Sequence, residues 1–97
     1  MSKVLRDPHE RLFFESMNGL LARDWQKTVT AASEATRLYP TFYDFYNHLG
    51  IASAELGRKD EAVKAFTTFL KFDHNTIEAA RARQRLDKIQ NPNPTGG

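Results

Sequence analysis

The chain contains no cysteine, which excludes disulfide bonds and thiolate chemistry and is typical of proteins from a reducing compartment. No run approaches the roughly 18 consecutive apolar residues that a membrane-spanning helix needs. The opening residues MSKVLRDPHERLFF contain neither the apolar core nor the cleavage site of a secretory signal. We therefore expect a cytoplasmic protein without a membrane span.

The chain also has little net charge and few clusters of reactive side chains. The 14 Lys and Arg residues nearly balance the 12 Asp and Glu residues, and a net charge of +2 does not by itself indicate nucleic acid. The histidines His9, His48 and His74 are far apart, and none pairs with a carboxylate at metal-ligand spacing. The sequence has no phosphate-binding glycine loop and no nucleophile motif. We therefore expect a protein that is not an enzyme and uses no metal or cofactor.

Five segments with helical periodicity account for most of the chain. Apolar residues recur three and four positions apart in residues 8–22, 25–39, 42–57, 59–72 and 76–90. Residues that favour helix starts precede four of these segments, namely Asp7, Asp24, Thr41 and Asn75. Pro40 ends the second segment, and Gly57 suits the left-handed position that follows a helix. The sequence therefore predicts an all-α chain of five helices.

The third and fourth segments form the clearest unit, because large and small residues are mixed on their facing sides. Gly50 and Ala62 would allow two antiparallel backbones to approach closely, and Tyr46 and Phe66 would fill the space around them. This pattern resembles a tetratricopeptide repeat. The matching residues are Tyr46, Leu49, Gly50, Leu56, Gly57, Ala62 and Phe66.

A tetratricopeptide repeat spans about 34 residues, and that period divides the chain. Residues 43–76 form the better repeat, although His74 stands where a proline is usual. Residues 9–42 align with it as a degenerate repeat, since the second helices match in size and polarity, whereas in the first helices Glu15 falls on Leu49. The resemblance implies a right-handed α-superhelix of two helix–turn–helix repeats.

The resemblance also makes residues 76–90 a C-terminal capping helix, and the length of the chain predicts a single domain over residues 1–90. Residues 91–97 are expected to be a disordered tail, because they have two prolines, two glycines and nothing to bury. The repeat period would turn Arg83 and Asp87 of this helix inward, together with Ala80. Its apolar stripe is different and consists of Ala79, Ala82, Leu86 and Ile89. We expect the stripe to be buried, because burying unpaired charges is costly, and Phe69 to pack against it.

In tetratricopeptide proteins the first helix of each repeat lines a concave groove that holds a peptide, which implies eight partner-binding positions here. They are Phe13, Met17, Leu20, Asp44, Asn47, Ile51, Arg81 and Arg85. An apolar floor beside a basic edge would suit a protein or peptide partner with apolar anchors and acidic or C-terminal carboxylate groups. The implied function is a protein–protein interaction module, as an adaptor, a scaffold or a small chaperone-like binder. Phe13 and Met17 occupy the places where chaperone-binding members have Lys and Asn, so that binding mode is not expected.

Two other functions are open from the sequence. Phe14, Leu21 and Trp25 belong to a large apolar cluster that would form a homodimer interface through the first two helices if it is exposed. Nucleic acid would instead contact the cations of the last helix, Arg81, Arg83, Arg85 and Lys88. This second alternative is weaker, because acidic residues dilute the patch and no aromatic residue interleaves to stack on bases. The plainest interpretation is that the apolar residues are core and the Arg-rich helix is a solvated face.

Overall fold

The structure is a computed structural model that describes residues 8–91. Within this range the chain forms α1 (Pro8–Ala22), α2 (Trp25–Leu38), α3 (Asp44–Glu55), α4 (Lys59–Phe72) and α5 (Ile77–Gln90). No strand occurs among the described residues, so the predicted all-α fold is confirmed, with helix ends within two residues of those predicted. None of these helices is both long and apolar enough to cross a membrane. The expected helix cap at Asp7 and the expected tail beyond Asn91 lie outside the described residues.

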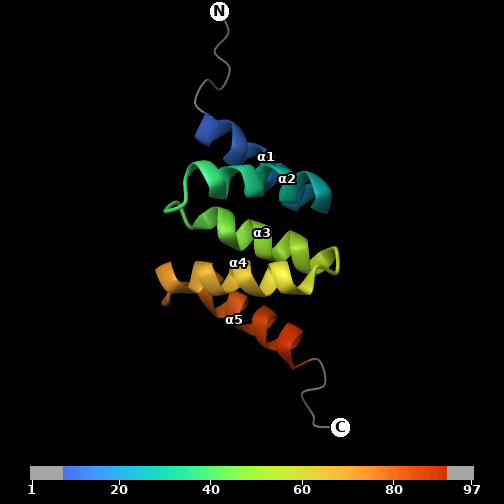
Figure 1. Ribbon diagram of the computed structural model, residues 1–97, viewed down its shortest axis with the longest axis vertical. Helices are drawn as coiled ribbons and strands as arrows, with labels where there is room; N and C mark the ends of the chain where they lie inside the picture. Colours follow the sequence, from blue (N-terminus) through green and yellow to red (C-terminus); the bar gives the residue numbers. More distant parts are fainter. Residues whose placement is uncertain (1–7, 92–97) are drawn as a thin grey trace, which may run out of the picture.

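The five helices stack in chain order along the longest axis of the molecule, each packed against the next (Figure 1). Two further contacts join alternate helices, because α1 packs on α3 and α3 packs on α5. In contrast, α2 and α4 do not pack on each other, and neither do α1 and α5. The helices therefore fall into two sets, α1, α3 and α5 on one side and α2 and α4 on the other, with α3 at the centre.

The turns that join α1 to α2 and α3 to α4 have the same geometry, 34 positions apart. Arg23 and Gly57 occupy the left-handed region, with φ of 59° and 79°. The N–H of the following residue, Asp24 or Arg58, donates to a carbonyl five residues earlier at 2.8 Å in both turns. The left-handed position predicted at Gly57 is confirmed, whereas Arg23 adopts this conformation despite its side chain.

The starts of α2 and α3 differ in how they are capped. Asp24 caps α2 as predicted, because its carboxylate accepts a hydrogen bond from the Lys27 backbone N–H. The prediction that Thr41 caps α3 was wrong. A hydrogen-bonded turn over residues 39–42 carries the chain past Thr41, and α3 begins only at Asp44, with no side-chain bond at its N-cap. The Asp44 carboxylate then lies in the first turn, at the positive end of the helix dipole.

The start of α5 was also misplaced by one residue, because Thr76 rather than Asn75 is its cap. The Thr76 hydroxyl accepts from the Ala79 N–H at 3.1 Å and donates to the Asp73 carboxylate at 2.7 Å. Asp73 also accepts from the backbone N–H groups of Asn75 and Thr76. These bonds, above all the one from the Thr76 hydroxyl, lower the pKa of Asp73. Asp73 therefore organises this loop and fixes which residue caps the helix.

The core combines large rings with alanine-rich helix faces. Phe45, Phe66 and Phe69 are fully buried. The two buried clusters that contain these rings also contain small residues, namely Ala31, Ala35, Ala62, Ala79 and Ala82. Small side chains let neighbouring backbones approach, and the rings fill the remaining space to the density of an organic crystal.

Two glycines mark places where helices approach closely. A Cβ atom on Gly50 of α3 would lie 2.7 Å from ring carbons of Phe66 on α4, well inside the normal contact distance. The predicted close approach at Gly50 is therefore confirmed. A Cβ atom on Gly19 of α1 would likewise clash with the Thr28 hydroxyl of α2. This second close approach was not predicted from the sequence.

The register of α5 follows its apolar stripe and not the repeat period. Ala79 and Ala82 are fully buried in the cluster of Phe66 and Phe69, and Leu86 and Ile89 pack against the same cluster. Arg83 is exposed, and its guanidinium donates to the His74 carbonyl. The predicted burial of the stripe and the predicted packing of Phe69 on this helix are confirmed.

The two equivalent turns predict opposite effects of two substitutions. A side chain in the left-handed region costs about 1–2 kcal/mol, and glycine avoids most of this cost. Arg23→Gly should therefore stabilise the protein by about 1 kcal/mol, raising Tm by roughly 4–8 °C. Gly57→Ala should destabilise it by about 1 kcal/mol, because no atom lies near its added Cβ and only the backbone conformation changes. Thermal unfolding of the two variants checks both signs, and a lower Tm for Arg23→Gly would contradict the assignment of strain at Arg23.

Candidate functional site

The side formed by α1, α3 and α5 carries two adjoining hollows. The first has a volume of about 310 Å³ and is lined by Phe13, Met17, Leu20, Asp44, Asn47, His48, Ile51 and Glu78. The second has a volume of about 460 Å³ and is lined by Arg23, Trp25, Ile51, Ala54, Glu55, Arg85, Lys88 and Ile89. Because Ile51 lines both hollows, we treat them as one surface and call it the inner groove.

Helical spacing explains why these residues meet. Residues 13, 17 and 20 of α1 are four and three positions apart, so they share one face of the helix. On α3 the same spacing joins Asp44, Asn47, Ile51 and Ala54. Because α1 and α5 both pack on α3 but not on each other, this face of α3 stays partly open between them. The groove therefore runs along α3 from its first residue to its last.

The structure brings together seven of the eight positions that the sequence proposed for partner binding. Phe13, Met17, Leu20, Asp44, Asn47, Ile51 and Arg85 line the inner groove. Arg81 is exposed and lines neither hollow. The cations of α5 that nucleic acid would contact do not share one surface. Arg85 and Lys88 line the groove, whereas Arg83 donates to the His74 carbonyl.

Sequence reasoning missed several groove residues. His48 lies four positions after Asp44 and three before Ile51, so its helical spacing could have placed it on this face. Glu78 reaches the groove from the first turn of α5, close to the start of α3, and only the packing of the two helices reveals this. Trp25, assigned by sequence to a self-association surface, is half-buried and lines the second hollow with Arg23.

The two ends of the inner groove differ in charge. At the first hollow, burial raises the pKa of Asp44, and the nearby charges of Asp73 and Glu78 raise it further. At the second hollow, the cations Arg23, Arg85 and Lys88 outnumber the carboxylate Glu55. None of these three cations forms an ion pair among the residues that the structure describes. The groove is therefore acidic at the start of α3 and basic at its end.

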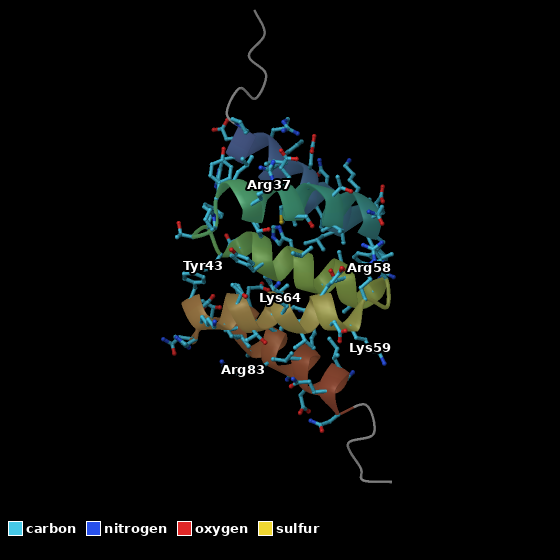
Figure 2. The ribbon with its side chains drawn as sticks, viewed as in Figure 1. Arg37, Tyr43, Arg58, Lys59, Lys64 and Arg83 are labelled. Carbon is cyan, nitrogen blue, oxygen red and sulfur yellow. The ribbon has the colours of Figure 1, made fainter. Side chains whose placement is uncertain are left out.

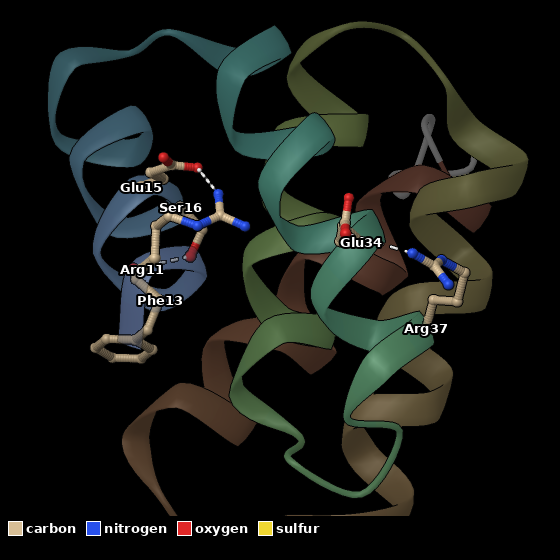
Figure 3. A network of polar contacts seen from close by, with 6 residues as sticks. All are labelled: Arg11, Phe13, Glu15, Ser16, Glu34 and Arg37. Carbon is tan, nitrogen blue, oxygen red and sulfur yellow. Dashed lines mark hydrogen bonds and ion pairs between the residues drawn. The ribbon is translucent and has the colours of Figure 1, made fainter. Parts of the chain in front are cut away.

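The floor of the first hollow contains a buried histidine held by a serine. His48 is 7% exposed, and its Nδ1 lies 2.8 Å from the Ser16 hydroxyl oxygen. The Ser16 hydroxyl donates to the Phe13 carbonyl at 3.1 Å (Figure 3), so it can accept a hydrogen bond from Nδ1–H of His48. Burial lowers the pKa of His48 to about 4. The imidazole is therefore neutral near pH 7 and joins α3 to α1.

Two polar atoms of the groove are buried without a hydrogen-bond partner among residues 8–91. Asn47 is 7% exposed, and its Oδ1 accepts no hydrogen bond. On the other side of Ile51, the Nη1 atom of Arg85 is buried and donates none. An unsatisfied buried polar group costs about 1–3 kcal/mol, so a ligand that paired with these atoms would recover part of that cost.

A third hollow, of about 440 Å³, lies on the opposite side between α2 and α4, where Tyr46 and Leu49 of α3 line its base. Figure 2 labels two cations of its lining, Arg58 at the α3–α4 turn and Lys64 on α4. Among the described residues, none of its lining side chains has a buried polar atom without a hydrogen-bond partner. Arg58 donates to the Gln26 side chain at 3.1 Å, and the Tyr46 hydroxyl donates to a backbone carbonyl at 2.8 Å. The unpaired buried atoms therefore make the inner groove the stronger candidate site.

The other two residues predicted for self-association, Phe14 and Leu21, line neither the inner groove nor the opposite hollow. Phe14 and Leu21 of α1 are 58% and 78% exposed. The His9 ring packs edge-to-face against the rings of Tyr39 and Phe42. In residues 8–91 no group of three or more His, Asp or Glu side chains could hold a metal ion.

Comparison with protein-family models gave no match, and no curated protein matched the sequence.

The buried histidine predicts a pH dependence of stability. The pKa of His48 falls from the ordinary 6.5 to about 4 in the folded state, so the unfolded chain takes up a proton that the folded chain resists. Stability should therefore fall as pH drops through this window, by about 2 kcal/mol between pH 7 and pH 5, and level off below pH 4. The raised pKa of Asp44 acts in the opposite direction, because protonating that carboxyl favours the folded state.

Urea unfolding across this pH range, with His48→Gln as the comparison, separates the two contributions. The wild-type chain should lose stability more steeply than the variant between pH 6.5 and pH 4. Parallel curves for the two proteins would show that His48 does not resist protonation in the folded state.

Proposed function

We propose that this protein is an interaction module that holds an extended segment of a partner protein in the inner groove. The observation that carries the proposal is the pairing of an apolar floor with buried polar atoms that lack partners. Phe13, Met17 and Ile51 supply apolar surface, and Asn47 and Arg85 supply the unpaired atoms. Binding sites combine mostly apolar walls with a few polar groups that fix orientation.

An extended segment suits the groove better than a helix does. A helix has already bonded its backbone N–H groups internally, except at its first turn. An extended segment has free N–H groups that can pair with polar side chains of the lining, and alternate side chains that can enter the two hollows. The distance along α3 from Asp44 to Glu55 is about 16 Å, which about five extended residues would span.

The architecture that we propose for the module is a right-handed superhelix of tetratricopeptide-like repeats. Support comes from the identical turns at Arg23 and Gly57, one repeat period apart, and from the close contact of Gly50 with Phe66. α5 would be the capping helix, since its outer side is polar apart from Ile77 and Ala80. In this arrangement α1, α3 and α5 supply the concave side, and binding requires no cofactor.

Selection of random displayed peptides against the purified chain tests the proposal, with two substitutions on α3 as a matched pair. Ile51→Arg places a charged side chain in the inner groove, whereas Leu49→Arg makes the same kind of change at the opposite hollow. We expect Ile51→Arg to weaken the selected peptides at least about tenfold and Leu49→Arg to change affinity less than about threefold.

Circular dichroism and thermal unfolding establish that both variants are folded before affinity is compared. The proposal fails if Ile51→Arg binds the selected peptides as tightly as the wild-type chain does. It also fails if only Leu49→Arg loses binding, because the site would then be the opposite hollow.

Self-association through α1 is a second candidate function, and the exposure of Phe14 and Leu21 favours it. The two residues are seven positions apart, so they share one face of the helix. Exposed apolar surface of this kind often marks an interface, although two side chains alone form a small patch. Trp25 is not part of this surface, because it lines the inner groove. Light scattering over a concentration series decides whether the chain dimerises.

A further inference from the structure

We infer that the segment bound in the inner groove carries both charges, with a basic residue at one end, an apolar centre and an acidic residue at the other. This inference rests on the proposed function and adds the chemistry of the partner. The sequence alone favoured a partner with acidic groups, because it placed the arginines of α5 at the edge of the groove and did not reveal that Glu78 lies in the same hollow as Asp44.

The acidic end is formed where the starts of two helices meet. Asp44 begins α3, and Glu78 lies in the first turn of α5. Both carboxylates line the first hollow, whose lining contains no Lys or Arg, and Asp73 lies near enough to act on Asp44 electrostatically. His48 in the same hollow stays neutral near pH 7. A ligand cation is therefore the group that would relieve the repulsion among these carboxylates.

The basic end is formed by the last turns of α5 and by the turn after α1. Arg85 and Lys88 come from α5, and Arg23 comes from the α1–α2 turn. Glu55 is the one carboxylate in the lining of this hollow, so the cations are in excess. A guanidinium offers paired donors to a carboxylate, and Arg85 forms no ion pair among the described residues.

Charge at both ends also decides which segments the groove rejects. A wholly acidic segment would place a carboxylate beside Asp44 and Glu78, and a wholly basic segment would place a cation beside Arg85 and Lys88. Juxtaposed like charges suppress wrong partners more strongly than correct pairs add affinity. The groove therefore selects a segment with opposite charges about five extended residues apart, separated by side chains that fit around Ile51.

The test uses four capped synthetic peptides with the same central sequence, Ala-Leu-Trp-Leu. Two of them carry Lys at one end and Glu at the other, in the two chain directions, and the others carry Lys at both ends or Glu at both ends. Fluorescence anisotropy at low ionic strength measures their affinities for the full chain. We expect one of the two mixed-charge peptides to bind at least about tenfold more tightly than either uniformly charged peptide.

A charge-reversed variant and a matched control locate the effect. Arg85→Glu with Lys88→Glu makes both ends of the groove acidic, so the preference should shift to the peptide with Lys at both ends. Lys59→Glu with Lys64→Glu changes the net charge equally but on α4 (both lysines are labelled in Figure 2), which contributes no residue to the groove lining. This control should leave the order of affinities unchanged.

Each outcome decides between the inference and the function on which it rests. Equal binding of all four peptides overturns the charge pattern and leaves the groove as a binding site. A shift of preference in the α4 control as well overturns the inference, because net charge and not the groove would then select the peptide. Failure of every peptide to bind, including in peptide selection, overturns both.

Discussion

The ring of Phe66 occupies the space that a side chain at position 50 would need, and the arrangement of the other helices depends on this contact. A Cβ atom on Gly50 would lie 2.7 Å from the ring, so α3 and α4 can pack this closely only with glycine there. Phe66 is fully buried and also belongs to the cluster that contains Ala79 and Ala82 of α5. One contact therefore sets the spacing of α3 and α4 and helps to place α5.

The inner groove follows from that spacing. Because one side of α3 is closed by α4, its other side is left between α1 and α5, which do not meet. This partial cover is enough to bury Asn47 and His48, but no described residue provides a partner for the Asn47 oxygen. It also leaves opposite charges at the two ends of α3, with Asp44 at the start and Arg85 and Lys88 near the end. These properties are the basis of the binding site that we propose.

Much of the fold could be predicted because the pattern of apolar residues is local. The period of the five segments gave the helices, and the stripe through Ala79 and Ala82 correctly overruled the repeat register of α5. Caps were less predictable, since the Asp73 side chain moves the cap of α5 to Thr76. The left-handed Arg23 carries no signal in its residue type. The acidic end of the groove depends on the meeting of residues 44 and 78, which no local pattern reveals.

The most direct test of the contact on which this account depends is the stability of Gly50→Ala, measured by urea unfolding. Helix propensity alone predicts that this change stabilises the protein by about 1 kcal/mol. The contact with Phe66 predicts the opposite sign, a net loss of about 1–2 kcal/mol, because the added methyl group overpacks the interface. In a Phe66→Leu background the cost of Gly50→Ala should shrink by about 1 kcal/mol or more, since the two positions are coupled. A more stable Gly50→Ala protein, or the same cost in both backgrounds, would contradict the account.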